Sequence, residues 1–163
     1  RYGAPPELHK PIRRQRQSGI RDSNDRGELL LQKRASGKYH SGGLWANACC
    51  SHPRWGEQTI PSAEARLGEE LGITCPLREV GSFVYLHRFA EKLYEYEYDH
   101  VLLGRYAGDF APDPQEIEAL RWVTPAELSA ELRQSPERFA PWLITAAPMV
   151  LQQPEFLDEK GRM

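Results

Sequence analysis

The sequence has few cysteines, no long apolar run and almost no excess of either charge. Its three cysteines are an odd number, and two of them, Cys49 and Cys50, are adjacent. Because adjacent cysteines rarely bridge each other, a disulfide framework is not expected, and a reducing compartment, the cytoplasm, is. No apolar run is long enough to cross a bilayer, and no signal peptide is visible. The formal net charge of −2 predicts no general affinity for nucleic acid or membrane.

The composition is that of an ordinary folded domain. Of the 163 residues, 40% are hydrophobic and 27% are charged, which suits one domain with a core of its own. No internal repeat is visible. We therefore expect a single domain over residues 1–163. Because the chain begins with Arg1 rather than Met, further residues are expected upstream.

Strand patterns follow a strong turn signal at residues 22–27. Residues 34–52 are expected to form a loop. Short apolar or alternating runs predict strands over residues 28–33, 80–87, 94–106 and 118–123.

Helical periodicity begins at Ser62, from which apolar residues recur on one face. Gly72 is well placed to end this helix, since glycine adopts the left-handed conformation of a C-terminal cap. Thr124 predicts the N-cap of a second helix. A last helix is expected within residues 136–151, interrupted by Pro148.

Residues 45–57 gather reactive side chains in one short, turn-rich stretch. They include two adjacent cysteines, His52 and two tryptophans. Core packing rarely asks for a thiol and an imidazole this close together, whereas chemistry often does. A free cysteine is most often a small buried hydrophobe, and the residues alone do not separate Cys49 from Cys50. The Cys-x-His spacing lacks the second half of a zinc finger.

The carboxylates of the chain have both a structural and a chemical interpretation. Glu70 lies at the end of the first predicted helix. It is either part of a solvated helix face or a Mg²⁺ ligand beside a diphosphate. Glu95 and Glu97 alternate along a predicted strand and so point to one face. Because two carboxylates on one face repel each other, such a pair either lies on a solvent-exposed face or binds a cation. With His9 and His52 nearby, they would form a mixed nitrogen and oxygen metal shell.

Three basic residues have similarly open interpretations. Arg34 and Lys38 flank a loop that contains glycine, and Arg66 lies on the first predicted helix. They are either ordinary surface charges or ligands of a phosphate group.

Taken together, these motifs resemble those of type 1 isopentenyl diphosphate isomerases, which belong to the Nudix superfamily. The resemblance runs from about Asp22 to about Leu151. It implies an α/β (α+β), Nudix-like fold in which a mixed sheet lies between helices, in agreement with the predicted elements. The motifs that carry it are Arg34-Ala35-x-x-Lys38, Gly43-Leu44-Trp45-x-Asn47-x-x-Cys50-x-His52-Pro53-x-x-Gly56-Glu57, Arg66-Leu67-x-x-Glu69-Glu70-Leu71-Gly72, Phe83-x-Tyr85, Glu95-x-Glu97-x-x-x-Val101 and Pro141-Trp142.

The resemblance implies a reaction that interconverts isopentenyl and dimethylallyl diphosphate in isoprenoid biosynthesis. It implies that Cys50 and Glu97 are the acid/base groups on opposite faces of the alkene, with Tyr85 hydrogen-bonded near Glu97. Protonating an alkene produces a tertiary carbocation, which requires an acid, a base and a dry site. Trp142 is the implied aromatic wall, whose face stabilises a cation. The sequence does not decide which group delivers the first proton.

The same resemblance implies two metal ions and a diphosphate clamp. The expected partner is a small-molecule diphosphate, without nucleic acid or membrane, and the expected state is a monomer or weak dimer. Mg²⁺, which also holds the diphosphate, is implied to bind Glu70 and the Cys50 backbone carbonyl. The implied diphosphate ligands are Arg34, Lys38 and Arg66. The implied ligands of a Mn²⁺ or Zn²⁺ ion are His9, His52, Glu95 and Glu97.

Two departures from the family pattern lie near the N-terminus. The family has a further metal-binding His before the position of His9. Here that residue either lies upstream of Arg1 or is absent, in which case the metal site has one ligand fewer. Residues 11–21 replace an apolar strand but hold four Arg, two Gln and only two large apolar residues. A buried strand of this composition would bury unpaired charges. Three interpretations are a basic loop, a diphosphate- or partner-binding arm, and a frameshift, which we favour.

A frameshift would leave a less stable or less active protein, and restoring an apolar strand at residues 11–21 should then raise both melting temperature and activity. Three other functions are alternatives. A Nudix hydrolase of nucleoside diphosphate derivatives fits Glu70, but its usual Arg-Glu pair falls on Ala65-Arg66. A non-catalytic, metal-stabilised domain would bind nucleic acid or an acidic partner through residues 10–21. An inactive relative of the isomerases is the third.

Overall fold

The computed structural model describes residues 16–21, 27–53, 56–91, 93–158 and 161–162. In these residues seven strands form one sheet with the main order β3-β2-β1-β6-β5, while β4 pairs with β1 and β7 with β2. The strands are β1 (Arg16–Arg21), β2 (Leu29–Arg34), β3 (Trp45–Asn47), β4 (Cys49–Ser51), β5 (Leu77–Ala90), β6 (Leu93–Arg105) and β7 (Ile117–Val123). The α-helices are α1 (Thr59–Leu71), α2 (Pro125–Gln134) and α3 (Pro141–Leu151), and the 3₁₀-helices are η1 (Pro136–Arg138) and η2 (Pro154–Phe156).

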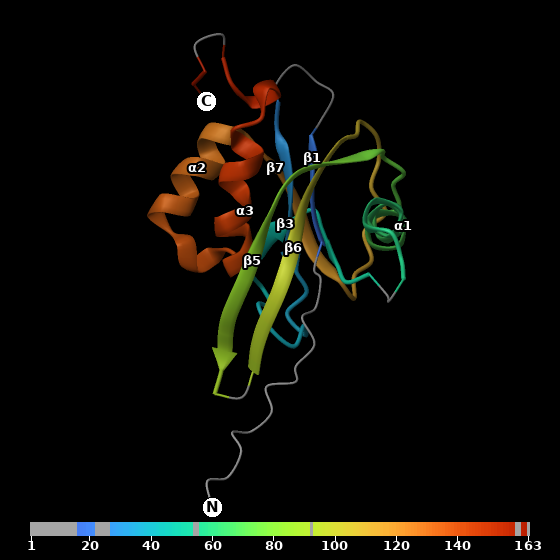
Figure 1. The fold of residues 1–163 in the computed structure, drawn as a ribbon, viewed down its shortest axis with the longest axis vertical. Coiled ribbons are helices and arrows are strands. Elements are labelled where there is room, and N and C mark those ends of the chain that lie inside the picture. The colour runs from blue at the N-terminus through green and yellow to red at the C-terminus, as the bar shows by residue number, and fades with distance from the viewer. Residues whose placement is uncertain (1–15, 22–26, 54–55, 92, 159–160, 163) are drawn as a thin grey trace, which may run out of the picture.

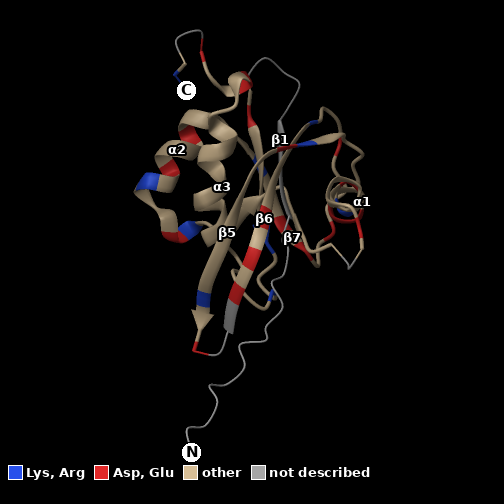
Figure 2. Cartoon of the chain, viewed as in Figure 1, with Lys and Arg blue, Asp and Glu red and all other residues tan. Residues whose placement is uncertain are grey.

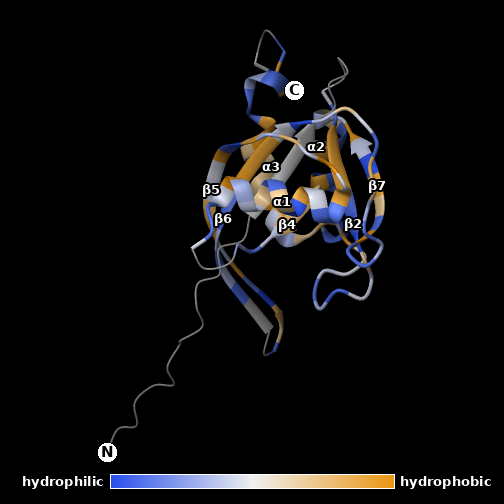
Figure 3. Cartoon of the chain, turned by 90° about the vertical axis from the view of Figure 1, so that its right-hand side faces the viewer, coloured by the Kyte–Doolittle hydropathy of each residue, from blue (hydrophilic) through white to orange (hydrophobic). Residues whose placement is uncertain are grey.

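The sheet separates two apolar cores, because successive residues of a strand point to opposite faces. Leu29 and Leu31 of β2 join the core that contains residues of α2 and α3, whereas Leu30 joins the core that contains residues of α1. Figure 1 shows α1 on one side of the sheet and α2 with α3 on the other. Figure 3 shows α1 crossing in front of the sheet. The predicted architecture, a mixed sheet between helices, is confirmed.

Local chemistry sets the helix boundaries. α1 begins at Thr59 rather than at Ser62 and is capped by Gly72 with φ 68°. A Cβ atom at Gly72 would lie 2.8 Å from the side chain of a neighbouring alanine, so both conformation and space require glycine there. α2 follows the predicted N-cap Thr124, which forms a capping box with Glu127. In the described part of the chain, no helix is long and apolar enough to span a membrane.

Within the segment 11–21, residues 16–21 do form a strand of the sheet, whereas the prediction that its side chains cannot be buried falls outside what the structure describes. These residues form β1, where Gln17 pairs with Val101 of the parallel β6 and with Cys50 of the antiparallel β4. Main-chain N–H and C=O groups make such a ladder whatever the side chains are, and this pairing was invisible to a composition argument. The sheet therefore does not lack the strand that a frameshift was expected to remove. The remaining residues of the segment, 11–15, lie outside the described residues.

Two further local predictions are corrected. Residues 34–52 are not all loop, because β3 and β4 lie within them and pair with β2 and β1. Pro148 lies inside α3 without interrupting it. Proline removes the hydrogen bond to the carbonyl four residues earlier. That carbonyl belongs to Ile144, an exposed residue that water can reach.

β5 and β6 form a long two-stranded ribbon (Figure 1). Its pairing places Tyr85 opposite Glu97 and Leu86 opposite Tyr96. Leu86 and Tyr96 are 67% and 47% exposed, whereas Tyr85 and Glu97 are 6% and 1% exposed. Glu95 is also buried, and acidic residues alternate with others along β6 (Figure 2). The prediction that Glu95 and Glu97 share a face is confirmed, and their interpretation as an exposed face is wrong.

Candidate active site

A cavity of about 480 Å³ lies between the loop that follows β2, strand β4 and helix α1. Segments distant in the sequence meet here because β1 brings β4 alongside β6, while α1 packs against β4. The residues singled out in the sequence that line the cavity are Arg34, Lys38, Cys50, His52, Arg66 and Glu70.

Cys50 lies half-buried on β4, beside the cavity. Its thiol donates to Oδ1 of Asn47 at 3.2 Å. Burial raises the pKa of Cys50 to about 12, although Arg34 and the hydrogen-bonding side chains around the thiol oppose that shift. The thiol is therefore protonated at neutral pH and suits a proton donor better than a nucleophile. The adjacent Cys49 is instead part of the core that contains α1.

Asn47 connects the thiol to Trp142, the second residue of α3. The indole Nε1 donates to the same Asn47 Oδ1 at 3.0 Å, while Asn47 Nδ2 donates to the Cys49 carbonyl at 2.7 Å. Trp142 is fully buried and is not among the residues that line the cavity. Its ring faces the guanidinium carbon of Arg34, 5.1 Å from the ring centroid. In this structure Trp142 is thus bonded to Asn47 inside the core and does not line the cavity.

Glu95 and Glu97 each carry one paired and one unpaired oxygen. Glu97 Oε1 lies 2.9 Å from Nε2 of His52. Glu95 Oε1 lies 2.6 Å from Nε2 of His40 and 3.1 Å from the hydroxyl of Tyr39. Oε2 of each carboxylate is buried and has no hydrogen-bond partner among the described residues. Burying such an oxygen without a partner is unfavourable, so both oxygens are suited to an additional ligand.

The donor chemistry of this pair fits a divalent cation. Burial raises the pKa of Glu95, but the hydrogen bonds from His40 and Tyr39 outweigh it and hold that pKa below its usual range. Glu95 is therefore ionised at neutral pH. Carboxylate oxygen and imidazole nitrogen are ligands that Zn²⁺ and Mn²⁺ accept. Among the described residues, however, no three His, Cys, Asp or Glu side chains form a metal-holding group, and His9 lies outside them.

Tyr85 lies on β5, opposite Glu97 on β6. Its hydroxyl oxygen is buried and has no hydrogen-bond partner among the described residues, so the expected hydrogen bond near Glu97 is not formed here. Burial raises the pKa of Tyr85, and the nearby carboxylates raise it further. The phenol therefore keeps its proton beside the acidic interior of the ribbon.

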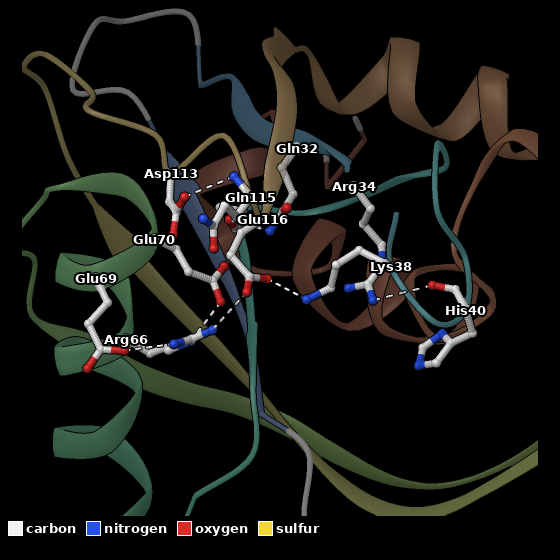
Figure 4. A network of polar contacts seen from close by, with 11 residues as sticks. Gln32, Arg34, Lys38, His40, Arg66, Glu69, Glu70, Asp113, Gln115 and Glu116 are labelled. Carbon is white, nitrogen blue, oxygen red and sulfur yellow. Dashed lines mark hydrogen bonds and ion pairs between the residues drawn. The ribbon is translucent and has the colours of Figure 1, made fainter. Parts of the chain in front are cut away.

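The basic residues of the cavity are held by carboxylates (Figure 4). Arg66 Nε lies 2.8 Å from Glu70 Oε1, and Arg66 Nη2 lies 3.5 Å from Glu116 Oε1. The other oxygen of Glu116 lies 2.5 Å from Nζ of Lys38. Glu116 thus bridges two of the three residues predicted to hold a diphosphate. The third, Arg34, donates to the backbone carbonyl of the neighbouring loop.

Glu70 lies in the last turn of α1 and is 3% exposed, so its interpretation as part of a solvated helix face is wrong. Burial raises the pKa of Glu70, with a contribution from Glu116, while Arg66 lowers it. A buried carboxylate at the wall of a cavity that is also lined by basic side chains suits a hard cation such as Mg²⁺.

Sequence reasoning missed His40 and Glu116. His40 stands between two glycines in a segment read as loop, and Glu116 precedes the strand predicted at residues 118–123. Neither position has a motif spacing of its own. The only available signal was the presence of a titratable residue beside the predicted turns and strand.

Sequence comparison shows which known proteins this chain is similar to. A family model described as the NUDIX domain matches residues 13–143. An isopentenyl-diphosphate Delta-isomerase of Halorhodospira halophila is 51% identical over 121 residues, which cover 73% of this chain and 69% of that protein. Isopentenyl-diphosphate Delta-isomerase 2 of Aromatoleum aromaticum is 45% identical over 130 residues, which cover 80% of this chain and 68% of that protein.

Solved structures show the same fold at low sequence identity. The MutT protein of Methanosarcina mazei superposes with a TM-score of 0.70 at 19% identity, covering 87% of this chain and 94% of that one. DR0079 of Deinococcus radiodurans superposes with a TM-score of 0.68 at 19% identity, covering 88% and 86%. At this level of identity the likeness concerns the fold alone.

Proposed function

The chain belongs to the NUDIX family and, within it, to the isopentenyl-diphosphate Delta-isomerases, and from this premise we propose that it interconverts isopentenyl and dimethylallyl diphosphate in isoprenoid biosynthesis. The observation that carries the proposal is the composition of one cavity. Its lining joins the protonated thiol of Cys50, and the His52 partner of Glu97, to three basic side chains. Basic groups recognise a diphosphate, while an acid and a base are what alkene isomerisation requires.

The reaction adds one proton and removes another, without an oxidant or a second substrate. A proton added to the terminal CH₂ carbon of isopentenyl diphosphate produces a tertiary carbocation. Loss of a proton from the CH₂ group beside the cationic carbon then forms the double bond of the dimethylallyl isomer. We assign the two transfers to Cys50 and Glu97, one donating and the other accepting, with roles exchanged in the reverse direction.

The carbocation must be kept from water, which would trap it as an alcohol. Glu97 is buried on β6 opposite Tyr85 of β5, and the rings of Tyr85 and Trp142 pack edge to face with centroids 6.4 Å apart. An aromatic face in such a dry region stabilises a cation by roughly 1–2 kcal/mol. We assign this role to Trp142, which donates to the Asn47 oxygen that also accepts from the Cys50 thiol. Because Trp142 is fully buried and does not line the cavity in this structure, the role requires that substrate binding expose its ring face.

At the end of the cavity that we assign to the diphosphate, basic side chains form ion pairs with a carboxylate, and the substrate would replace that carboxylate. Lys38 and Arg66 face Glu116 in this structure, and their pairing keeps both cations at the cavity wall. Diphosphate oxygens take the place of Glu116 as their partners, with Arg34 as a third ligand. Binding energy gained at this remote end positions the alkene at the acid and base.

We propose two cation sites around this machinery. Mg²⁺ would be held by Glu70, the Cys50 backbone carbonyl and the substrate, and would neutralise diphosphate charge. A Mn²⁺ or Zn²⁺ ion would set which oxygen of Glu97 carries a proton. The unpaired Oε2 atoms of the carboxylate pair support the second site. Its proposed ligands are His9, His52, Glu95 and Glu97.

The test is proton exchange in D₂O. The protein is incubated with isopentenyl diphosphate, Mg²⁺ and Mn²⁺, and deuterium in the recovered diphosphates is measured by mass spectrometry. Wild type should incorporate deuterium, and Cys50→Ala should lose that activity. Cys49→Ala is the matched control, because this neighbour lies in the core and should lower stability while keeping exchange. Absence of exchange in folded, metal-supplied wild type would contradict the proposal.

The same reaction mixtures test the hydrolase alternative, since a Nudix hydrolase would release phosphate from nucleoside diphosphate derivatives. The solved neighbours share only the fold, and the thiol would have no role in hydrolysis. We also propose that the chain works as a monomer or weak dimer in the cytoplasm. For the compartment, the support is that Cys49, Cys50 and Cys75, all three among the described residues, form no disulfide.

A further inference from the structure

His40 lies where three parts of the molecule meet. Its side chain is 3% exposed, and its Nε2 lies 2.6 Å from Glu95 Oε1. Its ring stacks on Phe89 at a centroid distance of 4.2 Å and meets Trp142 edge-on at 5.6 Å. Its backbone carbonyl accepts from Nη2 of Arg34 at 3.5 Å (Figure 4). The buried imidazole thus contacts the acidic ribbon and the aromatic cluster, while the backbone carbonyl of the same residue contacts Arg34 of the diphosphate clamp.

The hydrogen bonds define which atoms of Glu95 remain available. Nε2 of His40 lies within hydrogen-bond distance of Oε1, to which an imidazole N–H can donate, while Nδ1 faces the Ser41 hydroxyl at 3.3 Å. The Tyr39 hydroxyl donates to the same Oε1 at 3.1 Å. Both donors therefore act on one oxygen. Oε2 is left buried and, among the described residues, without a hydrogen-bond partner.

We propose that His40 is a positioning residue of the metal site, which fixes the Glu95 carboxylate so that Oε2 is presented to a divalent cation; the inference rests on the proposed function. A carboxylate ligand loses rotamer freedom when it binds an ion, and a hydrogen bond that already restrains it reduces that loss. Packing against Phe89 and Trp142 restrains His40 in turn. The imidazole also couples the orientation of Glu95 to the aromatic cluster.

The test replaces the hydrogen bond while keeping the packing. His40→Phe retains an aromatic ring and has no donor, and His40→Gln restores an N–H near the position of Nε2. Mn²⁺ affinity is measured without diphosphate by competition with a fluorescent chelator, in a Glu70→Gln background that removes the proposed Mg²⁺ ligand. We expect His40→Phe to weaken Mn²⁺ binding by about 10–100-fold and His40→Gln to recover most of it.

Tyr39→Phe is the matched control, because it removes the second hydrogen bond on the same oxygen from a residue that is 60% exposed. Its effect on Mn²⁺ affinity should be clearly smaller than that of His40→Phe. In a Glu95→Gln background, His40→Phe should cause little further loss, since the two residues act through one contact. If His40→Phe does not fold, His40→Met provides an apolar side chain that fills irregular space.

Several results would overturn the inference. They are wild-type Mn²⁺ affinity in a folded His40→Phe, equal losses in the Phe and Gln variants, or no Mn²⁺ binding by wild type. The deuterium-exchange assay distinguishes failure of the inference about His40 from failure of the proposed function. Wild type that binds Mn²⁺ in a His40-dependent manner but shows no deuterium exchange would refute the isomerase assignment and leave the positioning role in place.

Discussion

Asn47 offers the sharpest test of how the site is held together. It is buried, and its side chain makes three hydrogen bonds, with the Cys50 thiol, the Trp142 indole and the Cys49 carbonyl. Asn47→Ala removes all three. It also leaves an indole N–H and a carbonyl buried without their partner, each at about 1–3 kcal/mol. Adding a small packing loss, we expect the free energy of unfolding to fall by about 3–5 kcal/mol.

A double-mutant cycle isolates the indole contact. Trp142→Phe keeps most of the buried ring but removes its N–H. The hydrogen bond that it removes is also removed by Asn47→Ala, so the losses in free energy of unfolding of the two variants should overlap. Urea unfolding of the two single variants and the double variant should give an interaction energy of about 1–2 kcal/mol. Combination of Asn47→Ala with Leu67→Ala, in the core across the sheet, should be additive. Additivity within about 0.5 kcal/mol in the Trp142 cycle would refute the reasoning.

The remaining predictions concern the thiol, the α1 core, the clamp and β1. Burial holds the pKa of Cys50 at about 12, so the thiolate forms only at high pH; the rate of its alkylation by iodoacetamide, followed by peptide mass spectrometry, should still rise at pH 10, and a plateau near pH 9 would contradict this. Leu67→Ala should lower the free energy of unfolding in urea by about 2–5 kcal/mol, because Leu67 is fully buried, whereas Leu86→Ala on the exposed ribbon face should change it little. Glu116→Gln removes a carboxylate that competes with diphosphate for two cations, so calorimetry at low salt should show pyrophosphate binding tightened by about fivefold, the equivalent of about 1 kcal/mol; weaker binding would indicate that Glu116 helps to bind the anion or its cation. Ser18→Pro removes a main-chain donor from a central strand and should lower both thermal stability and deuterium exchange, and an unchanged melting temperature would count against β1.

The sequence was most informative where local chemistry decides the outcome. Gly72 ends α1 because its positive φ suits glycine, and Thr124 opens α2 through its own side chain. Strand alternation likewise placed Glu95 and Glu97 on one face. These features depend on residues close together in the chain, so a single sequence contains what is needed to predict them.

Non-local features escaped the same reasoning. β1 was rejected on its composition, although the sheet accepts it through main-chain hydrogen bonds to β4 and β6. His40 and Glu116 acquire their partners, Glu95 and the clamp cations, from residues 50 to 78 positions away in the chain. Trp142 is the expected aromatic wall of the pocket, but packing of α3 buries it fully, and it does not line the cavity.

The sequence by itself determined the family, the end of α1 at Gly72, the start of α2 after Thr124 and the residue types of the site, because motif spacing and local propensity are written along the chain. Only the tertiary structure decided which carboxylates are buried, which oxygens lack a partner and which cations are already paired. Those properties arise from contacts between β1, β4, β6, α1 and the loop after β2. Burial at such contacts raises the pKa of Cys50, and hydrogen bonding at them leaves Glu95 Oε2 without a partner among the described residues. No pattern along the sequence specifies either property.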